Sequence, residues 1–155
     1  MRHGILSVFC AFLFSLASAR AADRGVWVGG MLGEPTGATL KLWIDQDEAW
    51  SFGLGFNPFG ENSFQLHADY LLHNFELGNK LNVPSLAWYA GLGARFNGPD
   101  ETDSFEPGIR FPAGLTYFLE SRNMELFAEF APVLDLSPDI EIDINCVAGV
   151  RYFGW

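Results

Sequence analysis

Lysine is nearly absent from this chain: the full sequence contains only Lys41 and Lys80, and its formal net charge is −10. A water-soluble domain normally covers its outer face with many lysine and glutamate side chains, so this scarcity argues against an ordinary soluble surface. The acidic balance also argues against a nucleic-acid partner, because nucleic-acid binding requires a basic patch.

Cysteine is equally scarce, with Cys10 and Cys146 the two in the sequence. Cys10 falls within the expected export signal, so the mature chain would keep Cys146 alone and no internal disulfide is expected. We interpret Cys146 as a small apolar residue on the outer face of the last strand, because its neighbours supply no basic or metal-binding setting.

A long apolar helix is also missing. The apolar run Ile5–Leu16 is too short for a transmembrane helix, which needs about 20 apolar residues. Arg2 and His3 precede this run and small residues follow it up to Ala21, as in a secretory signal peptide. We therefore predict a cleaved signal peptide over residues 1–21 and one domain over residues 22–155.

Helical periodicity is not evident after the signal. Instead, eight stretches alternate apolar and polar residues between turns rich in Gly, Pro, Asn and Asp. Several of them reach the 9–11 residues that a tilted strand needs to cross a bilayer. The predicted strands are Val26–Leu32, Thr39–Ile44, Ala49–Asn57, Ser63–Asn74, Leu86–Asn97, Ile109–Leu119, Glu125–Leu134 and Ile142–Phe153.

The last stretch shows the pattern most clearly. From Ile142 to Tyr152 one face is continuously apolar, and the other carries Asp143, Asn145 and Arg151, because successive strand side chains point to opposite faces. Alternation alone does not say which face lies outside. Glycines and opposed charges on the polar face, aromatic residues near strand ends, and an even strand number favour a membrane barrel with both termini on the periplasmic side.

The inward faces of such a barrel would collect charges of both signs. Because buried charges must be paired, we predict a salt-bridged, hydrogen-bonded network that plugs the barrel, with a proton or ion path as the functional alternative. We expect His67 to hydrogen-bond to Asp69 or to a neighbouring strand. The predicted network is Lys41, His67, Asp69, Arg95, Arg110, Glu125, Glu129, Asp143 and Arg151.

The strand pattern, the signal peptide and the aromatic tail together resemble the small eight-stranded outer-membrane proteins of the OmpA transmembrane-domain and OmpX type. The resemblance implies an all-β, eight-stranded antiparallel up-and-down transmembrane β-barrel, exported to the cell outer membrane, surrounded by its lipid and monomeric. It also implies that Phe153 or Trp155 is the aromatic signal for the barrel-assembly machinery, and that the interior carries salt bridges.

No catalytic, cofactor-binding or metal-binding residue is predicted. His67 and His73 on one strand would lie roughly 20 Å apart, at about 3.3 Å per residue, which is too far to share a metal ion. Gly33–Gly37 lacks the Gly-Lys-Ser/Thr ending of a phosphate loop. The acidic loop 100–106 and the pair Asp139 and Glu141 lack the spacing of a calcium loop.

The function predicted is therefore structural or surface-interacting, without catalysis. One alternative is a soluble periplasmic, lipocalin-like barrel with its apolar face turned inward around a ligand. A lipid-modifying outer-membrane enzyme is a further alternative, although the sequence contains no His-x-Ser motif. Residues that would hold an apolar ligand in the soluble barrel are Trp50, Phe52, Trp88, Phe111 and Tyr117.

Overall fold

The structure is a computed structural model that describes residues 25–57, 64–98 and 106–155. The predicted signal peptide and all but the last residue of the acidic loop 100–106 lie outside these ranges. No helix in the described residues is long and apolar enough to cross a membrane. The elements are β1 (Val26–Gly33), β2 (Thr36–Trp43), β3 (Glu48–Phe56), β4 (Phe64–Asn74), α2 (Glu76–Lys80), β5 (Leu86–Asn97), β6 (Glu106–Arg110), β7 (Ala113–Leu119), the 3-10 turn η1 (Glu120–Arg122), β8 (Met124–Asp135) and β9 (Glu141–Phe153).

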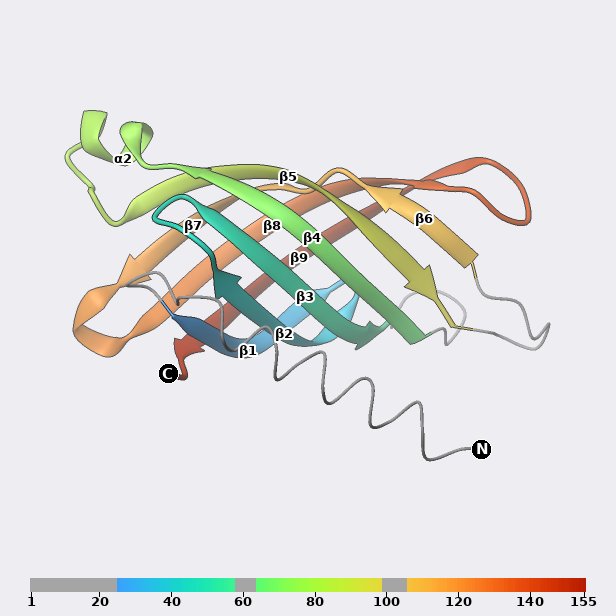
Figure 1. Ribbon diagram of the computed structural model, residues 1–155, viewed down its shortest axis with the longest axis horizontal. Coiled ribbons are helices and arrows are strands. Elements are labelled where there is room, and N and C mark those ends of the chain that lie inside the picture. The colour runs from blue at the N-terminus through green and yellow to red at the C-terminus, as the bar shows by residue number, and fades with distance from the viewer. Residues whose placement is uncertain (1–24, 58–63, 99–105) are drawn as a thin grey trace.

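The strands close into a ring, shown in Figure 1. Each strand pairs antiparallel with the next along the chain, except that β6 and β7 do not pair with each other, and β1 pairs with β9 to close the sheet. β6 and β7 together occupy one position between β5 and β8. The ring therefore has eight strand positions, and the predicted all-β, eight-stranded, up-and-down architecture is confirmed.

The sixth predicted strand, Ile109–Leu119, is not one element but two. The amide of Phe111 donates to the Pro132 carbonyl at 2.9 Å and that of Gly91 donates to the Pro112 carbonyl at 2.8 Å. Neither proline can donate the return bond, because proline has no N–H. The pairing register with β8 is the same on both sides of the break, so the barrel wall continues through it.

The two ends of the barrel differ in what they carry. The terminal end holds the start of β1, the end of β9 and the β2–β3, β4–β5 and β7–β8 connections. The loop end holds the β1–β2 and β8–β9 connections, together with the end of β3, the start of β4, the end of β5 and the start of β6. In Figure 1 the C-terminus and α2 lie at one end, and the β8–β9 hairpin lies at the other.

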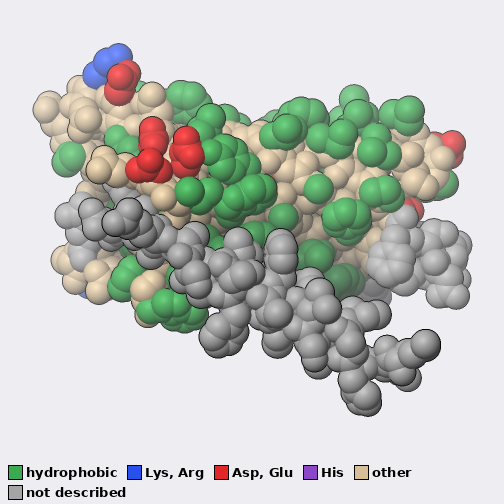
Figure 2. Space-filling view, viewed as in Figure 1, with side chains coloured by type: hydrophobic (Ala, Val, Ile, Leu, Met, Phe, Trp, Pro, Cys, Tyr) green, Lys and Arg blue, Asp and Glu red, His purple; other side chains and the backbone are tan. Residues whose placement is uncertain are grey.

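The apolar side chains point outward and the polar ones inward. Along β8, Glu125 and Glu129 are buried, whereas Leu126 is 42% exposed and Phe130 is 49% exposed. Figure 2 shows hydrophobic side chains over the middle of the visible face, with acidic and basic groups nearer the ends. This orientation is the reverse of that of a lipocalin-like barrel.

The helix α2 was not predicted from the sequence. Its five residues are too few to give a recognisable helical period. It lies within the long β4–β5 connection, which the sequence analysis treated as a loop.

Candidate functional site

The predicted interior network is the natural candidate site, and the structure brings most of it together. Eight of the nine residues are buried, with the side chain of Asp143 the exception at 46% exposed. The buried residues form one cluster near the terminal end and another near the barrel centre, except Arg95, which lies nearer the loop end. Asp143 lies at the loop end, in a third cluster.

Glu125 on β8 is the centre of the terminal-side cluster. Lys41 donates from Nζ to Glu125 Oε1 at 2.6 Å, and the Thr116 hydroxyl donates to the same oxygen at 2.6 Å. Arg151 Nη1 reaches Glu125 Oε2 at 3.3 Å. One carboxylate thus neutralises part of the charge of two buried cations, neither of which is more than 2% exposed.

Arg151 satisfies its other donors on β2 and β3. Its Nε and Nη2 donate to Thr39 Oγ1 at 3.1 and 3.0 Å, and Nη2 also lies 3.3 Å from Ser51 Oγ. The guanidinium carbon lies 3.8 Å from the ring centroid of Phe127, a distance suited to a cation–π contact. These contacts hold a charged group across the lumen, between β9, β2 and β3.

Aromatic rings fill the lumen next to this cluster, at the terminal end. Trp27, Trp43 and Phe118 form a buried group with Phe75 packed against it. The Lys41 ammonium lies 4.7 Å from the centroid of the Trp43 ring. The barrel interior is therefore occupied by packed rings at this end and by paired charges further in.

The central cluster joins β4, β5, β6 and β8. Arg110 donates from Nη2 to Glu129 Oε1 at 2.9 Å and from Nη1 to the Asp69 carboxylate. The Tyr89 hydroxyl donates to the second oxygen of Glu129 at 2.9 Å. Arg110 is 0% exposed and so depends on these two carboxylates for its charge compensation.

The loop-side cluster contains an acidic residue that the sequence analysis missed. Arg95 donates to Asp143 Oδ2 at 2.5 Å and to both oxygens of Asp135 at 2.5 Å. Asp135 lies just beyond the predicted strand Glu125–Leu134, but it is the last residue of β8. Val133 faces inward, so the residue two positions later, Asp135, would also face inward if the strand continued.

His67 does not hydrogen-bond to Asp69, the first of the two partners expected for it. The distance from His67 Nε2 to Asp69 Oδ2 is 3.9 Å, beyond hydrogen-bonding range. The imidazole instead lies over Gly53 on β3, where any Cβ would collide with the ring. Gly53 is therefore required for close packing inside the barrel.

Other inward polar residues extend the network beyond the predicted set. Gln65 donates to Asn145 across the lumen at 3.0 Å, and His73 Nδ1 lies 3.2 Å from the Asp47 carbonyl. These residues, and the Tyr89, Thr39, Ser51 and Thr116 partners above, were visible as members of the inward faces. They were missed because only formally charged or catalytic residue types had been selected.

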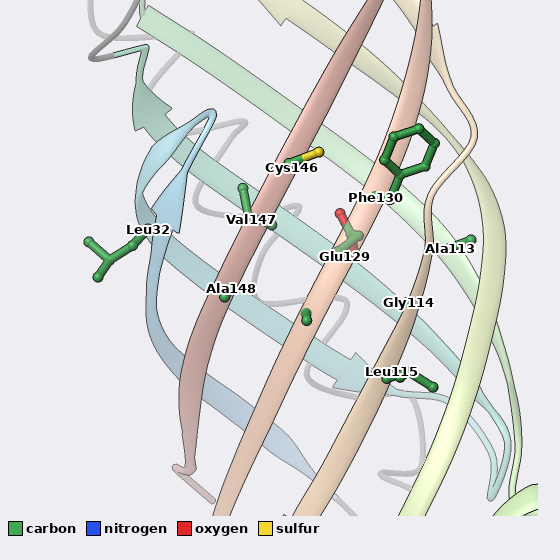
Figure 3. A pocket seen from close by; sticks show the side chains of 10 residues that line it. Leu32, Ala113, Gly114, Leu115, Glu129, Phe130, Cys146, Val147 and Ala148 are labelled. Carbon is green, nitrogen blue, oxygen red and sulfur yellow. The ribbon is translucent and has the colours of Figure 1, made fainter.

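Within the described part of the chain, no group of three or more His, Cys, Asp or Glu residues could hold a metal ion. A groove of about 560 Å³ crosses the outer wall over β7, β8, β9 and the end of β1. Figure 3 shows Leu32 and Phe130 on either side of Cys146 there. Neither serine nor histidine lines the groove, and its one carboxylate, that of Glu129, is bonded inside the barrel.

The two residues of the predicted assembly signal differ in their surroundings. The Phe153 ring lies 5.7 Å from that of Trp27 in an edge-on arrangement. Trp155 is 72% exposed, and its carbonyl accepts a hydrogen bond from the Val26 amide at 2.9 Å.

These features define a closed eight-stranded barrel with an apolar exterior and a polar interior. No protein-family model and no curated protein matches the sequence. Among solved structures, the chain is similar to the N-terminal β-barrel domain of OprF from Pseudomonas aeruginosa. The TM-score is 0.58 at 16% sequence identity, over 82% of this chain and 93% of that one. The predicted resemblance to small outer-membrane barrels is thereby confirmed at the level of the fold.

Proposed function

We propose that this chain is an integral outer-membrane β-barrel protein of structural or surface-interaction type, without catalysis. The observation that carries the proposal is the orientation of its side chains. Leu92 and Leu115 on the outer wall are 56% and 49% exposed, whereas Arg110 and Glu125 inside are 0% exposed. Exposing apolar area to water costs about 25 cal/mol per Å², and lipid contact removes that cost.

The distribution of outer aromatic residues supports the same location. Tryptophan and tyrosine favour the boundary between lipid and water, where one side of the ring is apolar and the other is hydrated. Among the described residues, every outward-facing Trp and Tyr belongs to the terminal half of the barrel. They are Trp50, Tyr70, Trp88, Tyr117, Tyr152 and Trp155, named here the aromatic band.

We further propose that the interior network and the terminal aromatic group close the barrel to ions. The support is the occupancy of the lumen by Arg151, Glu125 and Arg110 in paired contacts, next to packed rings. An eight-stranded barrel leaves little more room than its own side chains need. Planar-bilayer recordings of the purified protein should show no steady conductance, and a steady open-pore current would contradict the closure.

The location is tested by expressing the full precursor and separating outer membrane, inner membrane and periplasm. We expect the protein in the outer membrane as a monomer, with the signal peptide removed near Ala21 by mass. Recovery in the soluble periplasm would contradict the proposal. The lipocalin-like alternative gains no support from the structure, since Trp50, Trp88 and Phe111 are exposed on the outer wall.

A further inference from the structure

The β4–β5 connection is an ordered helical turn with a defined C-terminal cap. Asn82, just after α2, has a φ of 55°, a left-handed conformation that asparagine tolerates better than most residues. The amide of Val83 donates to the Gly78 carbonyl at 2.8 Å, and that of Asn82 donates to the Asn79 carbonyl at 3.2 Å. This pair of bonds is the Schellman motif, which ends a helix and fixes the chain that follows.

This ordered turn holds three apolar side chains in an exposed position. Leu77 and Leu81 are four residues apart and so share a helix face. They are 37% and 57% exposed, and Val83 is 36% exposed. A connection that needed only to reverse the chain would not require a capped helix that presents leucine side chains.

The turn lies next to the aromatic band and outside the barrel wall. Figure 1 shows α2 at the terminal end, beyond the line of β4 and β5 rather than over the lumen. The chain returns directly to β5, where Leu86 pairs with Tyr117 and Trp88 follows on the outer face. The apolar side chains of the turn therefore continue the outer surface that carries the band.

We propose that α2 and its cap are an interfacial anchor that binds phospholipid headgroups and upper acyl chains of the leaflet at the terminal end. This inference rests on the proposed membrane location. A short segment with apolar residues on one side and a cation beside them is stabilised in the interfacial layer. Lys80, the last residue of α2, is exposed and is positioned to contact anionic phosphate groups.

The test uses single-cysteine variants in the full chain, with Cys10 and Cys146 replaced by serine. An environment-sensitive fluorophore is attached at Leu81→Cys, or at Leu77→Cys if the first variant does not fold. Matched labels are placed at Leu92→Cys on the outer wall and at Asp47→Cys in the exposed β2–β3 turn. Each protein is inserted into phosphatidylcholine–phosphatidylglycerol vesicles with bromine either near the headgroup or deep in the acyl chains.

We expect the label on α2 to shift its emission to shorter wavelength and to lose intensity to headgroup-proximal bromine. The label at residue 92 should be quenched by deep bromine, and the label at residue 47 by neither. Suppose that the α2 label behaves like the label at residue 47 while the label at residue 92 is quenched. The proposal of an interfacial anchor is then wrong, and the proposed membrane location is retained. If the α2 label is shielded from water but not quenched, a protein partner or second copy covers it and the anchor is again wrong. If neither label is quenched, the membrane location itself fails.

Discussion

At the residue scale, the interior depends on a few charged side chains that each serve several partners. Glu125 accepts hydrogen bonds from Lys41, Thr116 and Arg151, and Arg110 spans two carboxylates. Removing one member of a buried ion pair is far more costly than removing a surface charge, because the remaining charge loses its compensation without gaining water.

Glu125→Gln should therefore lower the free energy of unfolding by about 3–5 kcal/mol, because it leaves Lys41 and Arg151 buried without their counter-charge. The measurement is urea unfolding of the protein refolded in lipid vesicles. Glu76→Gln, on the exposed surface of α2, is the matched control and should change stability little. Equal effects of the two substitutions would contradict the assigned role of Glu125.

Gly53→Ala should lower stability by about 1–3 kcal/mol, because the added methyl group overlaps the His67 ring. Gly30→Ala is the control, since its new Cβ would approach no closer than 3.6 Å to any neighbour. In a double-mutant cycle, Gly53→Ala should cost little once His67 is replaced by alanine. If Gly53→Ala still lowered stability by the full amount in the His67→Ala protein, the loss would not come from overlap with the His67 ring.

Much of the interior was predictable at this scale, because strand parity alone assigns Lys41, Arg95 and Glu125 to one side of the wall. Partner choice was not predictable. His67 was expected to hydrogen-bond to Asp69, two positions along its own strand, or to a neighbouring strand. The structure instead sets its ring over Gly53, on the neighbouring strand, a contact that depends on the three-dimensional register.

At the element scale, each strand turns polar side chains to the barrel interior and apolar side chains to the exterior. β8 alternates Glu125, Phe127 and Glu129 inward with Leu126 and Phe130 outward. The strands were predictable to within a few residues because this period is strong. The proline break between β6 and β7, and α2, were not predicted: the break leaves the register unchanged, and α2 is recognised by its cap at Asn82 rather than by a period.

Leu92→Arg and Leu115→Arg should each destabilise the lipid-inserted protein by about 2–4 kcal/mol if these residues face mid-bilayer. Leu136→Arg, just beyond the end of β8 at the loop end, should cost about 0–1 kcal/mol, as expected near the interface. Reversible unfolding in vesicles compares the three variants. Unchanged stability in both wall variants would count against the lipid-facing assignment.

At the scale of the whole molecule, closure and asymmetry are the dominant features. The β1–β9 pairing removes the open edges that a flat sheet would present. The even number of strand positions brings the start of β1 and the end of β9 to the terminal end, which also carries the aromatic band. Exposed acidic residues lie at both ends, with Asp47 and Glu76 at the terminal end and Asp139 and Glu141 at the loop end, so the aromatic band, not the acidic charge, distinguishes the two ends.

Substitutions of the two C-terminal aromatic residues distinguish a role in packing of the folded barrel from a role in its assembly. Trp155→Ala should leave stability nearly unchanged, because the side chain is 72% exposed, yet should slow insertion if the residue is recognised during assembly. Phe153→Ala is the comparison, since it also loses the contact with Trp27. Pulse-labelled appearance of folded protein in the outer membrane is the readout, and an unaltered rate for both variants would contradict an assembly role.

The central claim, a lipid-embedded closed barrel, is tested most directly by heat modifiability. Outer membranes from cells expressing the full precursor are run on a denaturing gel with and without boiling. We expect a membrane-fraction band whose migration differs before and after boiling, because a closed barrel resists detergent until heat opens it. A protein found in the soluble periplasm with one unchanged band would contradict the account.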